Sequence, residues 1–287
     1  MSKITFGELR DRLDRVQTYD NYMAAICPFH EDSKPSLLVF KDGWFRCLAC
    51  GASGSFDKLY RKLVGWDASQ QVREATSFSD PNLPSDLSEL EIVISEAHEA
   101  LLKFDQFRWY LKNRGVDGRI EICRLGWWNG WYTIPIFNPH MELQGAVLRA
   151  NATIQQATGQ RFAQPHGQKG MMYNPSWNTY NNRKTLAIVF GMFDALAVSD
   201  LGYAVVTSTS GKDSFHAEWL DEWRKKIVIF PDEGEYDTAM KLANKLGWRA
   251  EVAKIDYPDG VKDPCGFLET DRRSQLNILL ASNLGEN

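Results

Sequence analysis

Residues 27–51 begin with Cys27-Pro-Phe-His30 and end with Cys47-Leu-Ala-Cys50-Gly51. A Cys-x-x-His pair and a Cys-x-x-Cys pair have the spacing at which two tight turns direct their side chains at one tetrahedral Zn2+ ion. We therefore predict a structural zinc site whose ligands are Cys27, His30, Cys47 and Cys50.

The segment between the two ligand pairs predicts a β-hairpin. Residues 36–46 read Ser-Leu-Leu-Val-Phe-Lys-Asp-Gly-Trp-Phe-Arg, which is two short strands around an Asp42-Gly43 turn. Because so short a segment cannot build a large core, metal binding would supply much of its folding free energy. We expect a zinc ribbon here, preceded by an amphipathic helix within residues 2–20 and followed by a helix over residues 56–64.

The run CPFHEDSKPSLLVFKDGWFRCLACGASGSFDKLY, residues 27–60, resembles the N-terminal zinc-binding domain of bacterial and phage DNA primases of the DnaG type. The shared parts are Cys-Pro-x-His, a Lys-Pro-Ser segment, an aromatic strand, and Cys-x-x-Cys-Gly with a Gly-rich turn, in that order. The resemblance implies that this ribbon reads the bases of a DNA template. The residues expected to do so are Lys34, Trp44, Phe45 and Arg46.

Composition limits the class of protein. The chain has 287 residues, of which 44% are hydrophobic, so it can fold around ordinary cores. Two of the five cysteines, Cys123 and Cys265, stand outside the zinc pattern and show no disulfide spacing, which suits a reducing compartment such as the cytosol. No apolar run approaches the roughly 18 residues of a membrane span, and no signal peptide is visible. With a net charge of −4, any nucleic-acid contact must be a local patch.

Periodicity and composition predict a multidomain α/β protein in four parts. The parts are a zinc-ribbon domain over residues 1–66, a linker over 67–88, a small mixed α+β subdomain over 89–180, and an α/β sheet domain over 181–287. Proline and serine with little periodicity indicate that the linker is a mobile tether. The mixed subdomain should contain one or two helices over residues 90–112 and strands over residues 131–137 and 143–149.

The mixed subdomain also resembles the entry to the primase polymerase domain. The matching parts are Arg124-Leu-Gly126, Ile134-Pro-Ile136, Gly145 to Arg149, Arg161-Phe162 and Met172-Tyr-Asn174. In the family this strip is a basic ridge that receives the template and nucleotide phosphates, which implies that role for Arg149, Arg161 and Lys169. An arginine fork suits a phosphate because it can bind two oxygens at once. The alternative for each of these side chains is a solvated surface position.

From residue 184 onward strands and helices alternate, as in an α/β sheet. The predicted strands cover residues 186–190, 203–207, 226–230 and 250–254, and the predicted helices cover 192–200, 214–223 and 236–246, with a closing helix after the 262–264 loop. Carboxylates follow several of these strands, at the edge where open α/β sheets bind ligands.

This last part resembles the Toprim domain of primases, topoisomerases and some nucleases. Gly191, Asp194 and Asp232 keep family positions, as do Gly211 and the Lys262-Asp263 step. The resemblance implies a catalytic role for Asp194, Asp232 and Asp263, and a Mg2+ or Mn2+ ion held by oxygen ligands from Asp232, Asp263, Glu233 or Glu235.

Two positions depart from the Toprim pattern. Phe190 stands where the family has its glutamate, and Gly234 stands where it has the second aspartate. A phenylalanine can neither accept a proton nor bind a cation, so one role is lost unless a neighbour supplies it.

Two hypotheses about function follow from the resemblance. The first is a DNA primase that makes short RNA primers from ribonucleoside triphosphates on a single-stranded DNA template, beside a replicative helicase. Its setting would be the replication of a phage, plasmid or mobile element, in the cytoplasm of a bacterium or a phage-infected host. The alternative is a catalytically impaired primase-like subunit that binds single-stranded DNA or recruits a replication partner. Another Toprim activity, such as that of a nuclease, also stays open.

Overall fold

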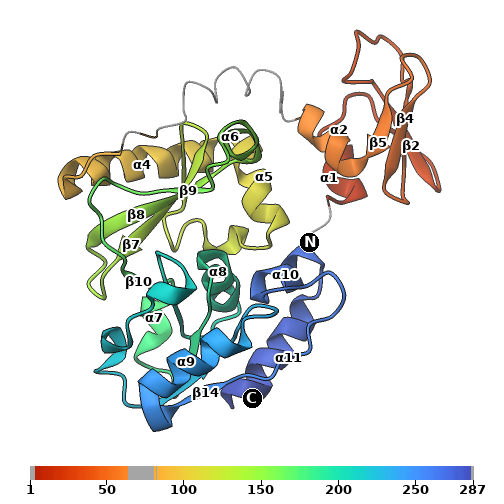
Figure 1. Ribbon diagram of the computed structural model, residues 1–287. Helices are drawn as coiled ribbons and strands as arrows, with labels where there is room; N and C mark the ends of the chain where they lie inside the picture. The colour runs from red at the N-terminus through yellow and green to blue at the C-terminus, as the bar shows by residue number, and fades with distance from the viewer. Residues whose placement is uncertain (1–3, 64–80, 82, 286–287) are drawn as a thin grey trace. The chain divides into compact units, whose positions relative to one another are not determined.

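The computed structural model describes residues 4–63, 81 and 83–285, and it divides into two compact units, residues 2–74 and residues 75–287 (Figure 1). Most of the predicted linker, and with it the predicted tether, lies outside the described residues. Across those residues, every helix is too short or too polar to cross a membrane. The predicted fold class, a zinc ribbon with mixed and α/β parts, is confirmed.

The N-terminal unit is a five-stranded antiparallel sheet with its strands in sequence order. Its strands are β1 (Gln17–Thr18), β2 (Tyr22–Ala25), β3 (Leu37–Phe40), β4 (Trp44–Cys47) and β5 (Ser53–Ser55). The predicted β3–β4 hairpin is confirmed, and Gly43 takes the positive φ of +100° that its turn requires.

Two short helices, α1 (Phe6–Arg10) and α2 (Phe56–Leu63), flank this sheet. The helix α2 was predicted, but the prediction of one amphipathic helix through residues 2–20 is wrong beyond Arg10. The chain leaves the helix at Asp11 and takes a positive φ of 51° at Arg15. This turn lets Gln17 pair with Ala24, so strand pairing replaces the end of the expected helix.

The larger unit contains a four-stranded antiparallel sheet, β6 to β9, with its strands in sequence order. Its strands are β6 (Gly126–Trp128), β7 (Trp131–Phe137), β8 (Leu143–Ala150) and β9 (Phe162–Ala163). The strands β7 and β8 were predicted. The helices of this part are α4 (Leu87–Lys103), α5 (Asp105–Asn113) and α6 (Ala152–Thr158). Asp86 caps α4 through the Ser88 and Glu89 N–H groups, which starts this helix before the predicted Leu90.

A second sheet completes the unit, in the order β10-β12-β11-β13-β14. These strands are β10 (Met172–Tyr173), β11 (Thr185–Ile188), β12 (Val205–Ser208), β13 (Lys226–Ile229) and β14 (Ala250–Val252); β10 is antiparallel to β12, and the others are parallel. The helices are α7 (Trp177–Tyr180), α8 (Met192–Asp200), α9 (Tyr236–Leu246), α10 (Pro264–Glu269) and α11 (Arg273–Leu284). Both α8 and α9 match their predicted limits.

The predicted helix over residues 214–223 is wrong. Short 3-10 turns, η2 (Lys212–Ser214) and η3 (Ala217–Leu220), take its place, with Phe215 and His216 extended between them. Phe215, Leu220 and Trp223 are all buried in one core cluster with the sheet and α9. The irregular path allows these three apolar side chains to reach that core.

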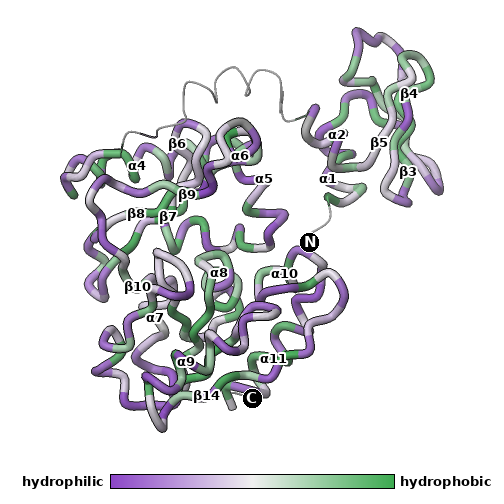
Figure 2. The backbone as a smooth tube through the Cα atoms, viewed as in Figure 1, coloured by the Kyte–Doolittle hydropathy of each residue, from purple (hydrophilic) through white to green (hydrophobic). Residues whose placement is uncertain are grey.

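Alternating side chains give the parallel sheet two buried faces. Ala187, Val205 and Val228 belong to a core shared with α8 and α11, and Leu186, Ile188 and Ile227 belong to a core shared with α9. Figure 2 shows hydrophobic residues along most of α8. The first core also takes in Ile134 and Ile136 of β7, so one continuous core joins the two sheets of this unit.

Candidate functional site

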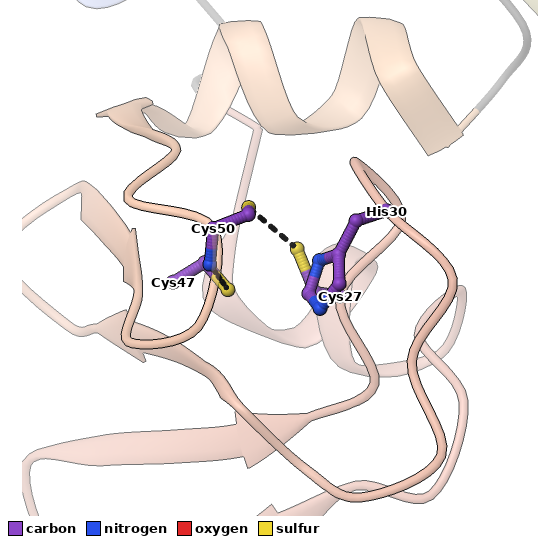
Figure 3. Close-up of side chains that lie close together, drawn as sticks. All are labelled: Cys27, His30, Cys47 and Cys50. Atoms are coloured by element: carbon purple, nitrogen blue, oxygen red, sulfur yellow. Dashed lines mark hydrogen bonds between the residues drawn. The ribbon is translucent and has the colours of Figure 1, made fainter.

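The first candidate site lies in the N-terminal unit, where four side chains meet (Figure 3). The ligand atoms of Cys27, His30, Cys47 and Cys50 all lie within 4.8 Å of one another. Cys27 follows β2 and Cys47 ends β4, while the Cys50 N–H donates to Cys47 Sγ at 3.4 Å. Gly51 has a positive φ of 73°, which lets the chain turn back after the second pair. The structure therefore brings the predicted zinc ligands together.

The chemistry of this cluster fits a metal ion. His30 Nδ1 is buried without a hydrogen-bond partner among the described residues, and its other nitrogen, Nε2, lies 3.9 Å from Asp32 Oδ2. Asp32 accepts hydrogen bonds from the Cys27 N–H at 3.0 Å and from Ser36 Oγ at 2.5 Å. Ser36 Oγ in turn lies 3.3 Å from Cys47 Sγ. Side chains that orient metal ligands in this way tune a site from outside it.

Sequence reasoning missed Asp32 and Ser36. The available signal was an acid two residues after the ligand His30, and a serine in the Lys-Pro-Ser segment. Burial opposes ionisation of the Cys47 thiol, but the Cys50 N–H and the Ser36 hydroxyl lower its pKa to about 6. In the same cluster, burial and the neighbouring Cys47 and Cys50 raise the pKa of Cys27 to about 12, so without a metal the proton stays on Cys27. A thiolate is the form in which cysteine binds zinc.

The ribbon surface matches the predicted base-reading residues only in part. Lys34, Trp44 and Arg46 are exposed. Phe45 is buried and stacks on Phe29 with ring centroids 5.3 Å apart, so the prediction that Phe45 contacts template bases is wrong. Successive residues of a strand point to opposite faces, which sends Phe45 into the core while its neighbours Trp44 and Arg46 face solvent.

The second candidate site is a cleft of about 580 Å³ in the larger unit. One wall comes from β8, β9 and the residues beside them, and includes Arg149, Arg161 and Phe162. The other wall comes from the segments that follow the parallel strands and from the start of α10. The lining residues of that wall include Phe190, Asp194, Ser208, Gly211, Asp232 and Asp263. Arg149 and Arg161 of the predicted basic strip thus face one cleft with the predicted acids Asp194, Asp232 and Asp263.

Asp194 and Asp263 are fixed at two helix starts. Asp194 lies in the first turn of α8, is buried, and accepts the Cys265 N–H at 2.9 Å. Asp263 is the N-cap of α10 and accepts the Gly266 N–H at 2.7 Å. A Cβ at Gly191 would lie 2.2 Å from Asp194 Oδ2, so a larger residue here would have to displace the carboxylate. Both carboxylates are therefore held by backbone groups.

Asp232 and Glu235 follow β13, and each has one carboxylate oxygen without a hydrogen-bond partner in the described part of the chain. Asp232 Oδ1 and Glu235 Oε2 are buried and lack hydrogen-bond partners among the described residues. Lys212, from the turn after β12, forms an ion pair with Glu235 Oε1. Sequence reasoning missed Lys212, because its neighbour in space is distant in sequence.

The acids raise one another's proton affinity. Burial, and then the charges of Asp263 and Asp232, raise the pKa of Asp194 well above its usual value. Burial, and then Asp263 and Glu235, raise the pKa of Asp232 to about 7, although Lys212 opposes this shift. A bound cation would lower the pKa of both carboxyls, because it favours the ionised carboxylates.

Two further positions, the predicted ligand Glu233 and the residue Phe190 that departs from the Toprim pattern, have different surroundings. Glu233 is exposed, and its backbone N–H donates to Lys262 O at 2.7 Å. Phe190 is buried in the core shared with α9 and also lines the cleft. Within the described residues, the Cys/His cluster is the one group of three or more possible metal ligands whose ligand atoms lie this close together, all within 4.8 Å. The described acids of the cleft do not form such a cluster. Glu235, with its buried oxygen near Asp232, is thus better placed than Glu233 to supply a ligand.

The basic residues of the strip have different surroundings. Arg149 is buried, and its guanidinium donates to Tyr110 Oη, Gln155 Oε1 and Arg161 O at 3.1–3.4 Å. Arg161 is exposed at the cleft, whereas Lys169 is exposed and is not among the cleft-lining residues. Arg161 is thus the more available side chain for a phosphate.

Arg114 is a further cation of the cleft, which sequence reasoning missed. Its guanidinium lies 4.6 Å from the centroid of the Phe193 ring and 3.1 Å from Glu269 Oε1. It lines the cleft beside Asp194 and lowers the pKa of that carboxyl, against the larger effect of burial. No motif marks Arg114, because its partners lie on α8 and α10.

Comparison with known proteins gives matches to both units. Residues 9–89 match the CHC2 zinc finger family, which together with the Cys/His cluster supports a structural zinc ion. A DNA primase from Legionella pneumophila is 24% identical over an alignment of 330 positions, gaps included, and the alignment covers 91% of this chain and 55% of that protein. The chain therefore spans about half the length of this relative.

Solved structures match the fold. The zinc-binding and RNA polymerase domains of the Aquifex aeolicus primase superpose with a TM-score of 0.55 and 19% identity, over 98% of this chain and 86% of that chain. A DnaG primase catalytic domain bound to single-stranded DNA superposes with a TM-score of 0.52 and 12% identity, over 75% of this chain and 79% of that one.

Proposed function

We propose that this chain, which has the fold of the zinc-binding and RNA polymerase domains of DnaG-type primases, synthesises short RNA primers on single-stranded DNA. One observation carries the proposal: basic side chains of the β8–β9 edge and carboxylates at the ends of the parallel strands line a single cleft. Template-directed phosphoryl transfer needs both, because it depends on positioned phosphates and on neutralised charge.

We assign metal binding to the acids of the cleft and phosphate binding to its arginines. Asp232 and Asp263 would hold Mg2+ or Mn2+, and Asp194 and Glu235 would assist them as further carboxylates. The unpartnered buried oxygens of Asp232 and Glu235 fit this role. When bound, the metal would neutralise the nucleotide phosphates. Arg161 would bind a phosphate directly, and Arg149 would hold Arg161 and the strand edge in place through its hydrogen bond to Arg161 O.

The zinc ribbon would contact the template through Trp44, Arg46 and Lys34, which are exposed. We propose the division 1–66, 67–88, 89–180 and 181–287 for the ribbon, linker, basic subdomain and Toprim-like domain. Two elements cross these limits, since α4 begins at Leu87 and β10 (Met172–Tyr173) pairs with β12 in the sheet of the last part. The resemblance further suggests a replicative helicase as protein partner, and a phage, plasmid or mobile element as the replicating genome.

A second candidate function is single-stranded DNA binding without synthesis. The observation that favours it is Phe190, a buried ring at the place of the family glutamate. The binding surfaces are the same under both proposals, and they differ only in whether a metal-dependent reaction takes place.

Primer synthesis with labelled ribonucleotides on single-stranded DNA tests the two proposals, with and without Mg2+ or Mn2+. The primase proposal expects products with the parent protein that disappear in Asp232→Ala, which should still bind DNA. A parent protein that binds single strands but stays inert with every metal, nucleotide and template would overturn the primase proposal. Synthesis that persists in Asp232→Ala would remove Asp232 from the reaction.

A further inference from the structure

The cleft exposes one aromatic ring. Among the aromatic residues that line it, Phe190 and Phe193 are 8% and 7% exposed and pack in the cores, whereas Phe162 is 51% exposed. Phe162 begins β9, at the end of the β6–β9 sheet (Figure 1). Single exposed apolar residues are common on protein surfaces. The position of this ring in a cleft that also holds arginines and carboxylates calls for a further explanation.

The ring of Phe162 is supported by a fixed cation. Phe162 pairs directly with Arg149 across the β8–β9 ladder, and the Arg149 guanidinium lies 5.0 Å from the centroid of the ring. Arg149 is itself buried and hydrogen-bonded to Tyr110, Gln155 and the Arg161 carbonyl. A cation held near an aromatic ring attracts it and limits its motion. The contact with Arg149 therefore favours one position of the half-exposed ring.

We propose that Phe162 is a platform on which a nucleobase stacks inside the cleft. The inference rests on the proposed function and adds a base-binding subsite to it. Arg161, whose guanidinium lies 6.0 Å from the same ring centroid, is close enough to bind the phosphate attached to such a base. A cleft of about 580 Å³ can enclose a group of this size. Because every base has a π-face, the platform would accept all of them.

The base can belong to the incoming ribonucleoside triphosphate or to the template strand, since both present the same chemistry. Binding measurements on the full zinc-loaded chain distinguish these sources. ATP is compared with tripolyphosphate, which has the phosphates without the base. Oligothymidylate is compared with an abasic strand of the same length.

Three substitutions at Phe162 separate stacking from other effects. Phe162→Ala and Phe162→Leu remove the aromatic face, and the leucine keeps apolar bulk, whereas Phe162→Tyr keeps the ring. Trp248→Ala is the matched control, because Trp248 is 93% exposed and is not among the cleft-lining residues. Circular dichroism and thermal unfolding check the fold. Arg149 should stay in place, because its three hydrogen-bonding partners are untouched.

We expect Phe162→Ala and Phe162→Leu to weaken binding of a base-containing ligand by about 5- to 150-fold, the range given by base–aromatic stacking. Phe162→Tyr and Trp248→Ala should bind like the parent, and tripolyphosphate and the abasic strand should not discriminate among the variants. A loss confined to ATP assigns the platform to the nucleotide, and a loss confined to oligothymidylate assigns it to the template.

Other outcomes overturn the platform. These are unchanged binding of ATP and oligothymidylate in Phe162→Ala, full binding in Phe162→Leu, or an equal loss of tripolyphosphate. If Phe162→Ala binds and makes primers like the parent, the platform is wrong and the proposed function stands. If the parent stacks bases through Phe162 but makes no primers, the proposed synthesis is wrong and the platform stands.

Discussion

Replacing Asp232 by asparagine should make the protein more stable at high pH. The replacement removes a carboxylate that burial and the neighbours Asp263 and Glu235 hold at a pKa of about 7, against an ordinary value of 3.8. Below pH 3.8 this carboxyl is protonated in both the folded and the unfolded chain, so its ionisation does not lower the free energy of unfolding. As the pH rises through 7, the folded protein loses that proton, and the corresponding stability is lost.

The size of the effect follows from the two pKa values. One pKa unit corresponds to about 1.4 kcal/mol, so the ionised Asp232 costs the folded protein at most about 4 kcal/mol at pH 8. Between pH 5 and pH 8, the free energy of unfolding of the parent should fall by about 2–3 kcal/mol more than that of Asp232→Asn. The control Asp221→Asn changes an exposed carboxylate that is not among the cleft-lining residues, and it should follow the parent.

Urea unfolding between pH 5 and pH 8, in buffer without magnesium and with zinc retained, measures this difference. At pH 8, millimolar Mg2+ should restore stability to the parent but not to Asp232→Asn, because a ligand that binds only the folded state stabilises it. Parallel pH curves for parent and variant would refute the buried-carboxylate argument. Equal stabilisation by Mg2+ would show that the metal binds without Asp232.

Three further predictions concern the zinc site, the basic strip and the missing acids. Cys47→Ser should lower the zinc content measured by elemental analysis, and an unchanged metal content would contradict the ligand set. Arg161→Ala should weaken the binding of single-stranded DNA or nucleotide and reduce the salt dependence of that binding. Arg149→Ala should do the same and should also lower the melting temperature, because it leaves buried partners without hydrogen bonds. If both variants bind like the parent, the basic strip does not contact phosphates. The double variant Phe190→Glu, Gly234→Asp should raise the affinity for Mg2+ measured by calorimetry. It should also lower the stability of the metal-free protein, because it buries a charge at position 190 and places a side chain at position 234, where φ is +79°. No gain in affinity would show that carboxylates at these two positions do not bind the metal.

The zinc site and much of the α/β part were predictable because their signals are local. Ligand spacing placed the Cys/His cluster, and the apolar runs placed β7, β8 and α8. The helix predicted through residues 214–223 failed because the burial of Phe215 and Trp223 against the sheet outweighs helical spacing. Short edge strands such as β9 carry too few residues for a pattern, and their partners are distant in sequence.

The cleft shows the same division between local and distant information. Asp194, Asp232 and Asp263 follow strands or begin helices, so their positions could be read from the chain. Lys212 and Arg114 could not, because each acquires its role from a partner on another element. The burial of Arg149 was equally invisible, since it depends on Tyr110 and Gln155 lying nearby.

The continuous core that joins the two sheets of the larger unit limits how the cleft can move. Ile134 and Ile136 on one sheet share this core with Val205 and Val228 on the other, so no hinge separates the two walls. Opening the cleft wide would expose part of that apolar core to water, which is unfavourable. Small movements of side chains would disturb this core less. Amide hydrogens of β7 and β11 should accordingly exchange with solvent on one common, slow timescale.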